Sequence, residues 1–228
     1  RTLRAGLLTL SPLVTRQVYR KQREILPFMK KINEIFYSLQ GEGYNTGQPA
    51  LFIRFSVCNL RCSFCDTDFS SFEELDDDEI VRRALNIVNA KKAELQSADT
   101  TMPIIVLTGG EPTLQVDEAL VDALHKAGFT FIAMESNGTH EPPRGIDWLT
   151  VSPKERPIVT HCNELKVIFD GKQPINTHGI TADHYFLQPL DTGNEAENNR
   201  ILVDCFEYLL ANPQWRLSLQ THKLMGIR

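Results

Sequence analysis

Short apolar runs alternate with longer amphipathic segments along most of the chain. Seven runs rich in β-branched and aromatic residues predict strands at 50–56, 104–108, 131–135, 148–151, 164–169, 185–188 and 216–219. Three segments with apolar residues at helical spacing predict helices over 76–95, 116–127 and 198–210. On the third helix we expect one buried face, formed by Ile201, Leu202, Cys205, Leu209 and Leu210.

The predicted helices carry signals at their ends. Asp76, Asp77 and Asp78 begin the first helix, where acidic side chains interact favourably with the helix dipole, so we prefer a capping role over a metal site. Gly128 is suited to end the second helix. Strands alternating with helices predict an α/β fold with a mainly parallel sheet. Six or seven strands are too few for a closed eight-stranded barrel, so we expect a partial, open TIM-like barrel.

Composition bounds the class of protein. The chain has 228 residues, of which 42% are hydrophobic and 23% charged, as expected for a single globular domain. No apolar run approaches the roughly 20 residues needed to span a membrane. The net charge is −5, but residues 1–28 contribute +5, which leaves −10 on the remaining 200 residues. Such an acidic body argues against non-specific binding of nucleic acid.

Residues 1–28 form a basic leader that ends just before Met29. Three interpretations are open: sequence upstream of the true start with Met29 as initiator, a disordered basic arm, or a targeting peptide. We favour the first, exclude the leader from the fold, and expect residues 29–228 to form a single domain.

Three cysteines within eight residues are the main chemical signal. They are Cys58, Cys62 and Cys65, with the spacing C-x3-C-x2-C. Three thiolates on one loop can hold three irons of a 4Fe–4S cube and leave the fourth iron open for chemistry, whereas most such cubes use four cysteines. The alternatives are a structural zinc site, which His161 and Cys162 could complete, and unrelated thiols. We expect Cys162 and Cys205 to be small buried residues, and reduced cysteines to indicate a cytoplasmic protein.

A second motif follows about 45 residues downstream. The run IIVLTGGEP contains Gly109, Gly110, Glu111 and Pro112. In this order the two motifs resemble the radical S-adenosylmethionine superfamily. The resemblance implies that S-adenosylmethionine chelates the open iron, and that an electron from the cube cleaves it to a 5′-deoxyadenosyl radical.

Further short motifs narrow the resemblance. They are LQGE at 39–42, CDT at 65–67, SPK at 152–154, LQP at 187–189 and QTHK at 220–223. Together they resemble the 7-carboxy-7-deazaguanine synthase family over about residues 32–223. The family implies ring contraction of 6-carboxy-5,6,7,8-tetrahydropterin with release of ammonia, for queuosine and other 7-deazapurines. It also implies a Mg²⁺ ion, an electron donor such as flavodoxin or ferredoxin, and a homodimer.

The resemblance also implies site residues, with no catalytic group beyond the cofactor radical. Cys58, Cys62 and Cys65 would hold the cluster, and Thr67 the Mg²⁺ ion. The S-adenosylmethionine site would comprise Phe64, Cys65, Asp66, Gly110, Ser152, Pro153, Lys154 and Gln188. The substrate site would comprise Leu39, Gln40, Gly41, Arg54, Thr108 and His222.

Simpler interpretations compete with several of these roles. Arg54 either faces inward, where it needs an anion such as the substrate carboxylate, or faces water. Gln40 could be an ordinary loop residue, Lys154 a surface lysine, and His222 a structural histidine. Alternating Glu164 and Lys166 are expected to form an ion pair without a catalytic role. The rival functions are an activase that places a glycyl radical on a partner protein, and a zinc-stabilised binding module.

Overall fold

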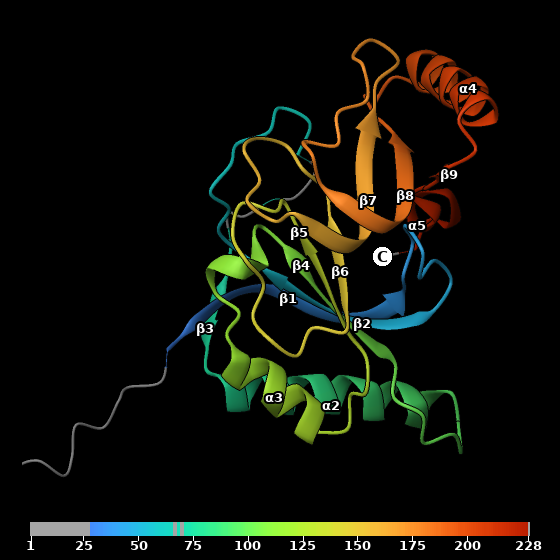
Figure 1. Ribbon diagram of the computed structural model, residues 1–228. Coiled ribbons are helices and arrows are strands. Elements are labelled where there is room, and N and C mark those ends of the chain that lie inside the picture. Colours follow the sequence, from blue (N-terminus) through green and yellow to red (C-terminus); the bar gives the residue numbers. More distant parts are fainter. Residues whose placement is uncertain (1–27, 66–67, 69–70, 228) are drawn as a thin grey trace, which may run out of the picture.

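The computed structural model describes residues 28–65, 68 and 71–227 (Figure 1). Residues 1–27 of the leader lie outside this range, so the interpretations of the leader stay predictions. Asp66 and Thr67 also lie outside it. Within the described residues, no helix is both long and apolar enough to cross a bilayer.

A single nine-stranded sheet forms the centre of the fold, with the strand order β3-β1-β2-β4-β5-β6-β7-β8-β9. From β2 to β9 all neighbouring strands are parallel, while β1 is antiparallel to both β2 and β3. The sheet ends in the edge strands β3 and β9 and does not close, which confirms the open, mainly parallel α/β barrel. The strands are β1 Lys30–Leu39, β2 Pro49–Phe55, β3 Glu73–Leu75, β4 Ile104–Gly109, β5 Ile132–Ser136, β6 Trp148–Val151, β7 His161–Phe169, β8 Thr181–Pro189 and β9 Trp215–Leu217.

Helices cover the outside of the sheet. The helices are α2 Asp77–Glu94, α3 Glu118–Lys126, α4 Glu195–Ala211 and α5 Thr221–Met225, with a short 3₁₀ helix, η1 Pro112–Leu114. In Figure 1, α2 and α3 lie side by side below β1 and β2, and contacts join the two helices. Helix α4 packs against β8 and β9 at the other end of the sheet. All three predicted helices are therefore present, within a few residues of their predicted ends.

The prediction of which residues form the buried face of α4 is only partly correct. Ile201 and Cys205 are buried, as predicted. Leu202 and Leu210 are instead exposed, and 70% of Leu210 is accessible. A single layer of sheet lies beneath this helix, so one stripe of apolar residues is enough to cover it.

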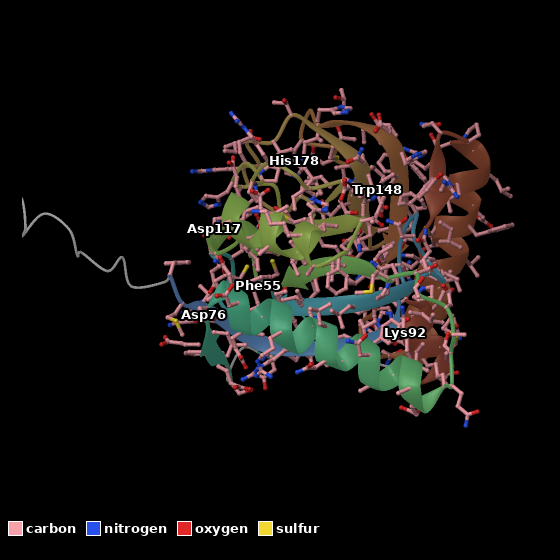
Figure 2. All side chains as sticks on the ribbon, turned by 90° about the horizontal axis from the view of Figure 1, so that it is seen from below. Phe55, Asp76, Lys92, Asp117, Trp148 and His178 are labelled. Carbon is pink, nitrogen blue, oxygen red and sulfur yellow. The ribbon has the colours of Figure 1, made fainter. Side chains whose placement is uncertain are left out.

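The starts of α2 and α3 are joined by a buried lysine. Asp76 caps α2 by accepting a hydrogen bond from the Glu79 N–H at 2.8 Å, which confirms its predicted capping role. Lys30 on β1 is fully buried and donates to both Asp77 and Asp117, the latter at 3.2 Å. Figure 2 shows Asp76 and Asp117 at the same end of the molecule. Lys30 thereby fixes both helices to the sheet.

The inner face of the sheet changes character along its strands. Successive side chains of a strand point to opposite faces, so every second residue faces inward. Toward the amino ends of β2, β4 and β5 the inner face is apolar, with Phe52, Val106 and Ala133 in one buried cluster. Two residues further on, the same face presents Arg54 and Thr108 on β2 and β4, and a glutamate on β5. On these three strands the polar inward-facing groups therefore lie toward the carboxyl ends.

Candidate active site

A pocket of about 810 Å³ opens at the carboxyl ends of the parallel strands. Open α/β sheets bind ligands at this edge. Fourteen of the predicted site residues line it: Leu39, Gln40, Gly41, Arg54, Cys58, Cys62, Phe64, Cys65, Thr108, Gly110, Ser152, Lys154, Gln188 and His222. Pro153 is not among the lining residues. Segments about 180 residues apart in sequence therefore meet at one cavity.

The cysteine loop leaves β2 and lies against the Gly-Gly-Glu-Pro segment. The Gly110 N–H donates to the Phe55 carbonyl at 2.8 Å, and the Glu111 N–H donates to the Val57 carbonyl at 2.9 Å. A Cβ atom on Gly110 would lie 2.0 Å from the Val57 oxygen, so only glycine allows this approach. Val57 itself has a φ of 84°, a strained value for a β-branched residue. The loop is thus held tightly where it begins.

The donor set of this loop fits an iron–sulfur cluster. Cys58, Cys62 and Cys65 are all free thiols at the pocket, and Cys65 N–H closes a turn on the Cys62 carbonyl at 3.2 Å. Burial, the Glu111 carboxylate and the other two cysteines raise the pKa of Cys58. A cation that binds thiolates would remove this penalty. Among the described residues, no three His, Cys, Asp or Glu side chains surround one point as ligands of a single metal ion would.

The zinc alternative is not supported by the positions of its residues. His161 begins β7 and buried Cys162 follows it, so both lie at the amino end of that strand. The cysteine motif follows the carboxyl end of β2, which runs parallel to β7 in the same sheet. His161 and Cys162 therefore lie at the opposite end from the motif. Cys205 is buried on α4, as predicted.

A buried carboxylate anchors the end of β5 beside the cysteine loop. Glu111 is fully buried, and its Oε2 accepts the Asn137 N–H at 2.7 Å. Its Oε1 accepts hydrogen bonds from Ser136 Oγ at 2.8 Å, and from Thr113 Oγ1 and N–H at 2.6 and 3.2 Å. The glutamate of the Gly-Gly-Glu-Pro motif therefore joins the ends of two neighbouring strands.

Three side chains close a cyclic hydrogen-bond ring next to Cys58, which we call the asparagine ring. Asn137 Nδ2 donates to Asn59 Oδ1 at 3.0 Å, and Asn59 Nδ2 donates to Thr139 Oγ1 at 2.8 Å. Thr139 Oγ1 in turn donates to Asn137 Oδ1 at 2.6 Å. Because Asn59 directly follows Cys58, the ring ties the cysteine loop to the segment after β5.

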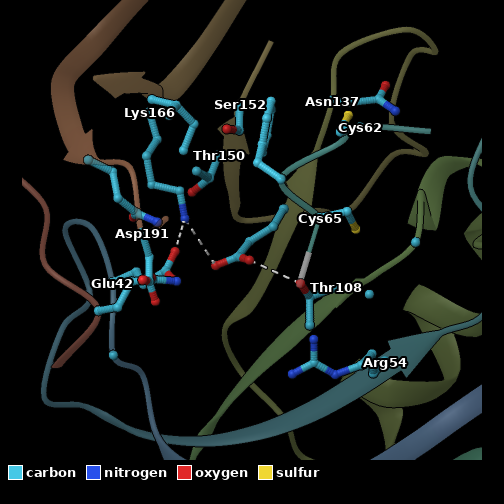
Figure 3. Close-up of a pocket in the computed structure, with 18 of the residues that line it drawn as sticks. Glu42, Arg54, Cys62, Cys65, Thr108, Asn137, Thr150, Ser152, Lys166 and Asp191 are labelled. Atoms are coloured by element: carbon cyan, nitrogen blue, oxygen red, sulfur yellow. Dashed lines mark hydrogen bonds and ion pairs between the residues drawn. The ribbon is translucent and has the colours of Figure 1, made fainter. Parts of the chain in front are cut away.

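The inner wall of the pocket carries a buried charge cluster (Figure 3). Lys166 on β7 forms an ion pair with Glu42 and lies 3.9 Å from Glu135 Oε1. Burial alone would raise the pKa of Glu42, but the charge and hydrogen bond of Lys166 hold it at about 2. Burial opposes the charge of Lys166, but the surrounding carboxylates outweigh it and raise the lysine pKa. The predicted ion pair between Lys166 and Glu164 is wrong, because the ion pairs of Lys166 are with Glu42 and Glu135. Glu164 accepts the Tyr44 N–H at 3.0 Å.

Arg54 faces inward and already has an anionic partner. Its Nε donates to Glu34 Oε1 on β1 at 2.8 Å. Figure 3 shows the guanidinium group below Thr108, at the floor of the pocket. The prediction that an inward arginine needs an anion is therefore met within the protein itself, by a glutamate that was not predicted as a site residue. Glu34 pairs with it across adjacent antiparallel strands.

Other predicted site residues contact one another in two places. Lys154 donates to Ser152 Oγ at 2.7 Å and lies over the Phe64 ring, 5.4 Å from its centre. Burial and the charge of Lys166 lower the Lys154 pKa to about 8, so it is not an ordinary surface lysine. His222 packs against Gly41, where a Cβ would lie 2.3 Å from His222 Nδ1.

Several lining residues were not predicted as site residues. They are Glu34, Glu135, Asn137, Lys166 and Asp191, and Lys166 was named from the sequence only as a member of an ion pair. Glu135 could have been found, because it falls two residues after an inward alanine at the end of an apolar strand, the same pattern that marks Arg54 and Thr108. It accepts hydrogen bonds from Gln40 Nε2 and Thr108 Oγ1, both at 3.0 Å.

Comparison with known proteins agrees with this geometry. The family model described as "Radical SAM superfamily" matches residues 52–150. A 7-carboxy-7-deazaguanine synthase from Bacteroides thetaiotaomicron is 47% identical over 202 residues, which cover 88% of this chain and all of the relative. One from Bordetella pertussis is 42% identical over 214 residues, covering 86% and 98%. The crystal structure of QueE from Escherichia coli matches with a TM-score of 0.59 and 27% identity, covering 84% of this chain and 93% of that one.

The match to this chain spans at least 93% of the length of each of these three proteins. None of the three is named as an activase or a zinc module. The cofactors of the superfamily, a 4Fe–4S cluster and S-adenosylmethionine, are accordingly those of this chain. The chain belongs to the 7-carboxy-7-deazaguanine synthase family within the radical S-adenosylmethionine superfamily.

Proposed function

We propose that this enzyme converts 6-carboxy-5,6,7,8-tetrahydropterin to 7-carboxy-7-deazaguanine with release of ammonia, as a carbon–nitrogen lyase of queuosine and 7-deazapurine biosynthesis. One observation carries the proposal: a relative named 7-carboxy-7-deazaguanine synthase is 47% identical over its whole length. The pocket supports it, since it places polar groups of both signs beside three free thiols.

The cofactor side of the pocket is assigned to the cysteine loop and the strand ends around it. Cys58, Cys62 and Cys65 would hold the cluster. Phe64, Asp66, Gly110, Ser152, Lys154 and Gln188 would bind S-adenosylmethionine, whereas Pro153, which does not line the pocket, would only hold its two neighbours in place. When bound, these cofactors supply the radical that removes a hydrogen from the substrate. The chain's own residues position the reactants, which is where such a protein contributes most to the rate.

The substrate side is assigned to the turn after β1 and the floor of the pocket, comprising Leu39, Gln40, Gly41, Arg54, Thr108 and His222. Arg54 would meet the substrate carboxylate with the guanidinium nitrogens that do not bond Glu34. The Gln40 amide bonds Glu135 through Nε2 and the Gly41 N–H through Oε1, at 3.0 and 2.7 Å. Gln40 would therefore shape the turn, leaving backbone groups to face the pterin.

Mg²⁺ and two partners complete the proposal. The Thr67 hydroxyl, which lies outside the described residues, would bind Mg²⁺ together with the substrate carboxylate. A flavodoxin or ferredoxin would donate the electron. We also propose a homodimer, supported by exposed apolar side chains such as Val203 and Phe206 on the outer face of α4. Light scattering on the reconstituted protein would report its mass.

The decisive experiment is anaerobic reconstitution with iron and sulfide. The protein would then be incubated with S-adenosylmethionine, Mg²⁺, a reductant and 6-carboxytetrahydropterin. We expect 7-carboxy-7-deazaguanine by mass spectrometry, its loss in Cys62→Ala, and its retention in Cys205→Ala, whose thiol is buried on α4. Cleavage of S-adenosylmethionine without a deazapurine would refute the assigned substrate and favour the activase alternative.

A further inference from the structure

The turn between β1 and β2, residues 40–48, reaches across the open side of the barrel. Figure 1 shows it beside β9 and α5, which follow at the other end of the chain. The Gly41 carbonyl accepts hydrogen bonds from the Thr221 N–H at 3.0 Å and from Thr221 Oγ1 at 2.9 Å. The Tyr44 N–H donates to Glu164 on β7. The first and last parts of the sheet are thus joined through this turn.

Ser218, directly after β9, forms hydrogen bonds both to the turn and to Gln188. Among the hydrogen bonds described, no other residue joins these two. Ser218 Oγ accepts the Gly43 N–H at 3.0 Å and donates to Gln188 Oε1 at 3.0 Å. The Ser218 N–H donates to the Leu187 carbonyl at 2.9 Å, which fixes the residue against β8. Only 2% of Ser218 and 6% of Gln188 is exposed, so water does not compete for these bonds.

The directions of the two hydrogen bonds are determined by their chemistry. A backbone N–H can only donate, so Ser218 Oγ must accept from Gly43. An amide oxygen can only accept, so the hydroxyl proton goes to Gln188 Oε1. Gln188 is then held with Oε1 toward the serine and with Nε2 left to donate elsewhere. The position of the turn and the orientation of the Gln188 amide are therefore linked through one hydroxyl group.

We propose that Ser218 is a positioning residue that couples the two halves of the pocket. This rests on the proposed function, which assigns the turn that contains Gln40 and Gly41 to the pterin and Gln188 to S-adenosylmethionine. A ligand that fixes Gln188 also fixes the serine hydroxyl that accepts the Gly43 N–H, and so fixes the turn. A ligand that fixes the turn fixes Gln188 through the same hydroxyl. Each ligand should strengthen binding of the other by the same factor, since linkage is reciprocal.

The test measures binding without turnover. Anaerobic calorimetry on the reconstituted protein, with no reductant, gives the Kd of 6-carboxytetrahydropterin with and without S-adenosylmethionine, and the converse pair. For the unaltered protein we expect both ratios to be equal and about fivefold or more, the lower end of typical coupling. In Ser218→Ala both ratios should fall to near one, while each ligand alone still binds.

Thr46→Ala is the matched control. The exposed Thr46 Oγ1 donates to the Gly43 carbonyl at 2.8 Å, so its loss weakens the same turn without any bond to Gln188. The coupling ratio should be unchanged in this variant. Ser218→Cys, of similar size and with a weak donor and acceptor, should retain part of the coupling if the alanine variant does not fold.

Two results would overturn the inference: full coupling in Ser218→Ala, or a ratio of one in the unaltered protein. If the unaltered protein binds S-adenosylmethionine but no pterin under any condition, the assigned substrate is wrong, and the coupling falls with it. If only the coupling is wrong, both ligands still bind, but the Kd of each is the same with and without the other.

Discussion

Replacing Glu111 with glutamine changes almost no volume but alters four buried hydrogen bonds. The carboxylate accepts three bonds through Oε1 and one through Oε2 from the Asn137 N–H. A glutamine has only one acceptor oxygen. Whichever way the amide is placed, its NH₂ group must face at least one donor that it cannot satisfy. The residue is fully buried, so water cannot take over.

The magnitude follows from these contacts. A buried donor left without an acceptor costs about 1–3 kcal/mol. Each charge-assisted bond that becomes neutral also loses roughly half its strength. Together these terms amount to about 3 kcal/mol or more. For a domain of this size, about 1 kcal/mol shifts Tm by roughly 2–4 °C, so we expect a fall of about 6–12 °C.

Thermal unfolding of the reconstituted protein, followed by circular dichroism at one scan rate, measures this shift. Glu118→Gln is the matched control, because its side chain is 61% exposed and lies 3.7 Å from Arg144. Such a surface change should alter stability by no more than about 0.5 kcal/mol. Ser136→Ala removes one of the four donors and also the acceptor of the Gly138 N–H, so it should cost about 1–3 kcal/mol. A Tm for Glu111→Gln within about 2 °C of the unaltered protein would refute the reasoning.

Asn59→Ala opens the asparagine ring and should lower the affinity for iron about tenfold, the lower end of the effect for groups that orient metal ligands. Iron retention equal to that of the unaltered protein after anaerobic desalting would contradict this. Lys166→Met leaves Glu42 without its buried cation and should cost about 3–5 kcal/mol at pH 7. Lys166 holds the Glu42 pKa at about 2, below its usual 4.5, so the ion pair stabilises fully above pH 4.5 and less as pH falls toward 2. The Tm difference between variant and unaltered protein should therefore narrow from pH 7 to pH 4, and a constant difference would exclude this pair as its source. Gly43→Ala places a Cβ 2.0 Å from a carboxylate oxygen at a φ of +66° and should lower Tm more than Gly47→Ala, which has a φ of +88° but open space; equal shifts in thermal unfolding would show that the close contact is unimportant.

Local patterns were sufficient for most of the secondary structure. Apolar runs placed seven strands and amphipathic segments placed three helices, because burial of one face repeats every two or 3.6 residues within a single element. Strand β1 was missed because polar residues such as Lys31, Asn33 and Glu34 interrupt its apolar alternation. Strand β3 has only three residues, two of them glutamate, and only its pairing with β1 makes it a strand.

The sequence by itself determined the parallel α/β class, the cysteine loop, and the polar residues Arg54 and Thr108 near the ends of two apolar strands. Only the tertiary structure decided which of these side chains meet. Lys166 pairs with Glu42 across 124 positions rather than with nearby Glu164, and Ser218 joins a turn 175 residues before it to Gln188. Periodicity reports whether a residue faces inward, which depends on its neighbours along the chain. The partner of an inward-facing residue depends on how the sheet curves and on which strands the connections place side by side. Both follow from the packing of the whole domain.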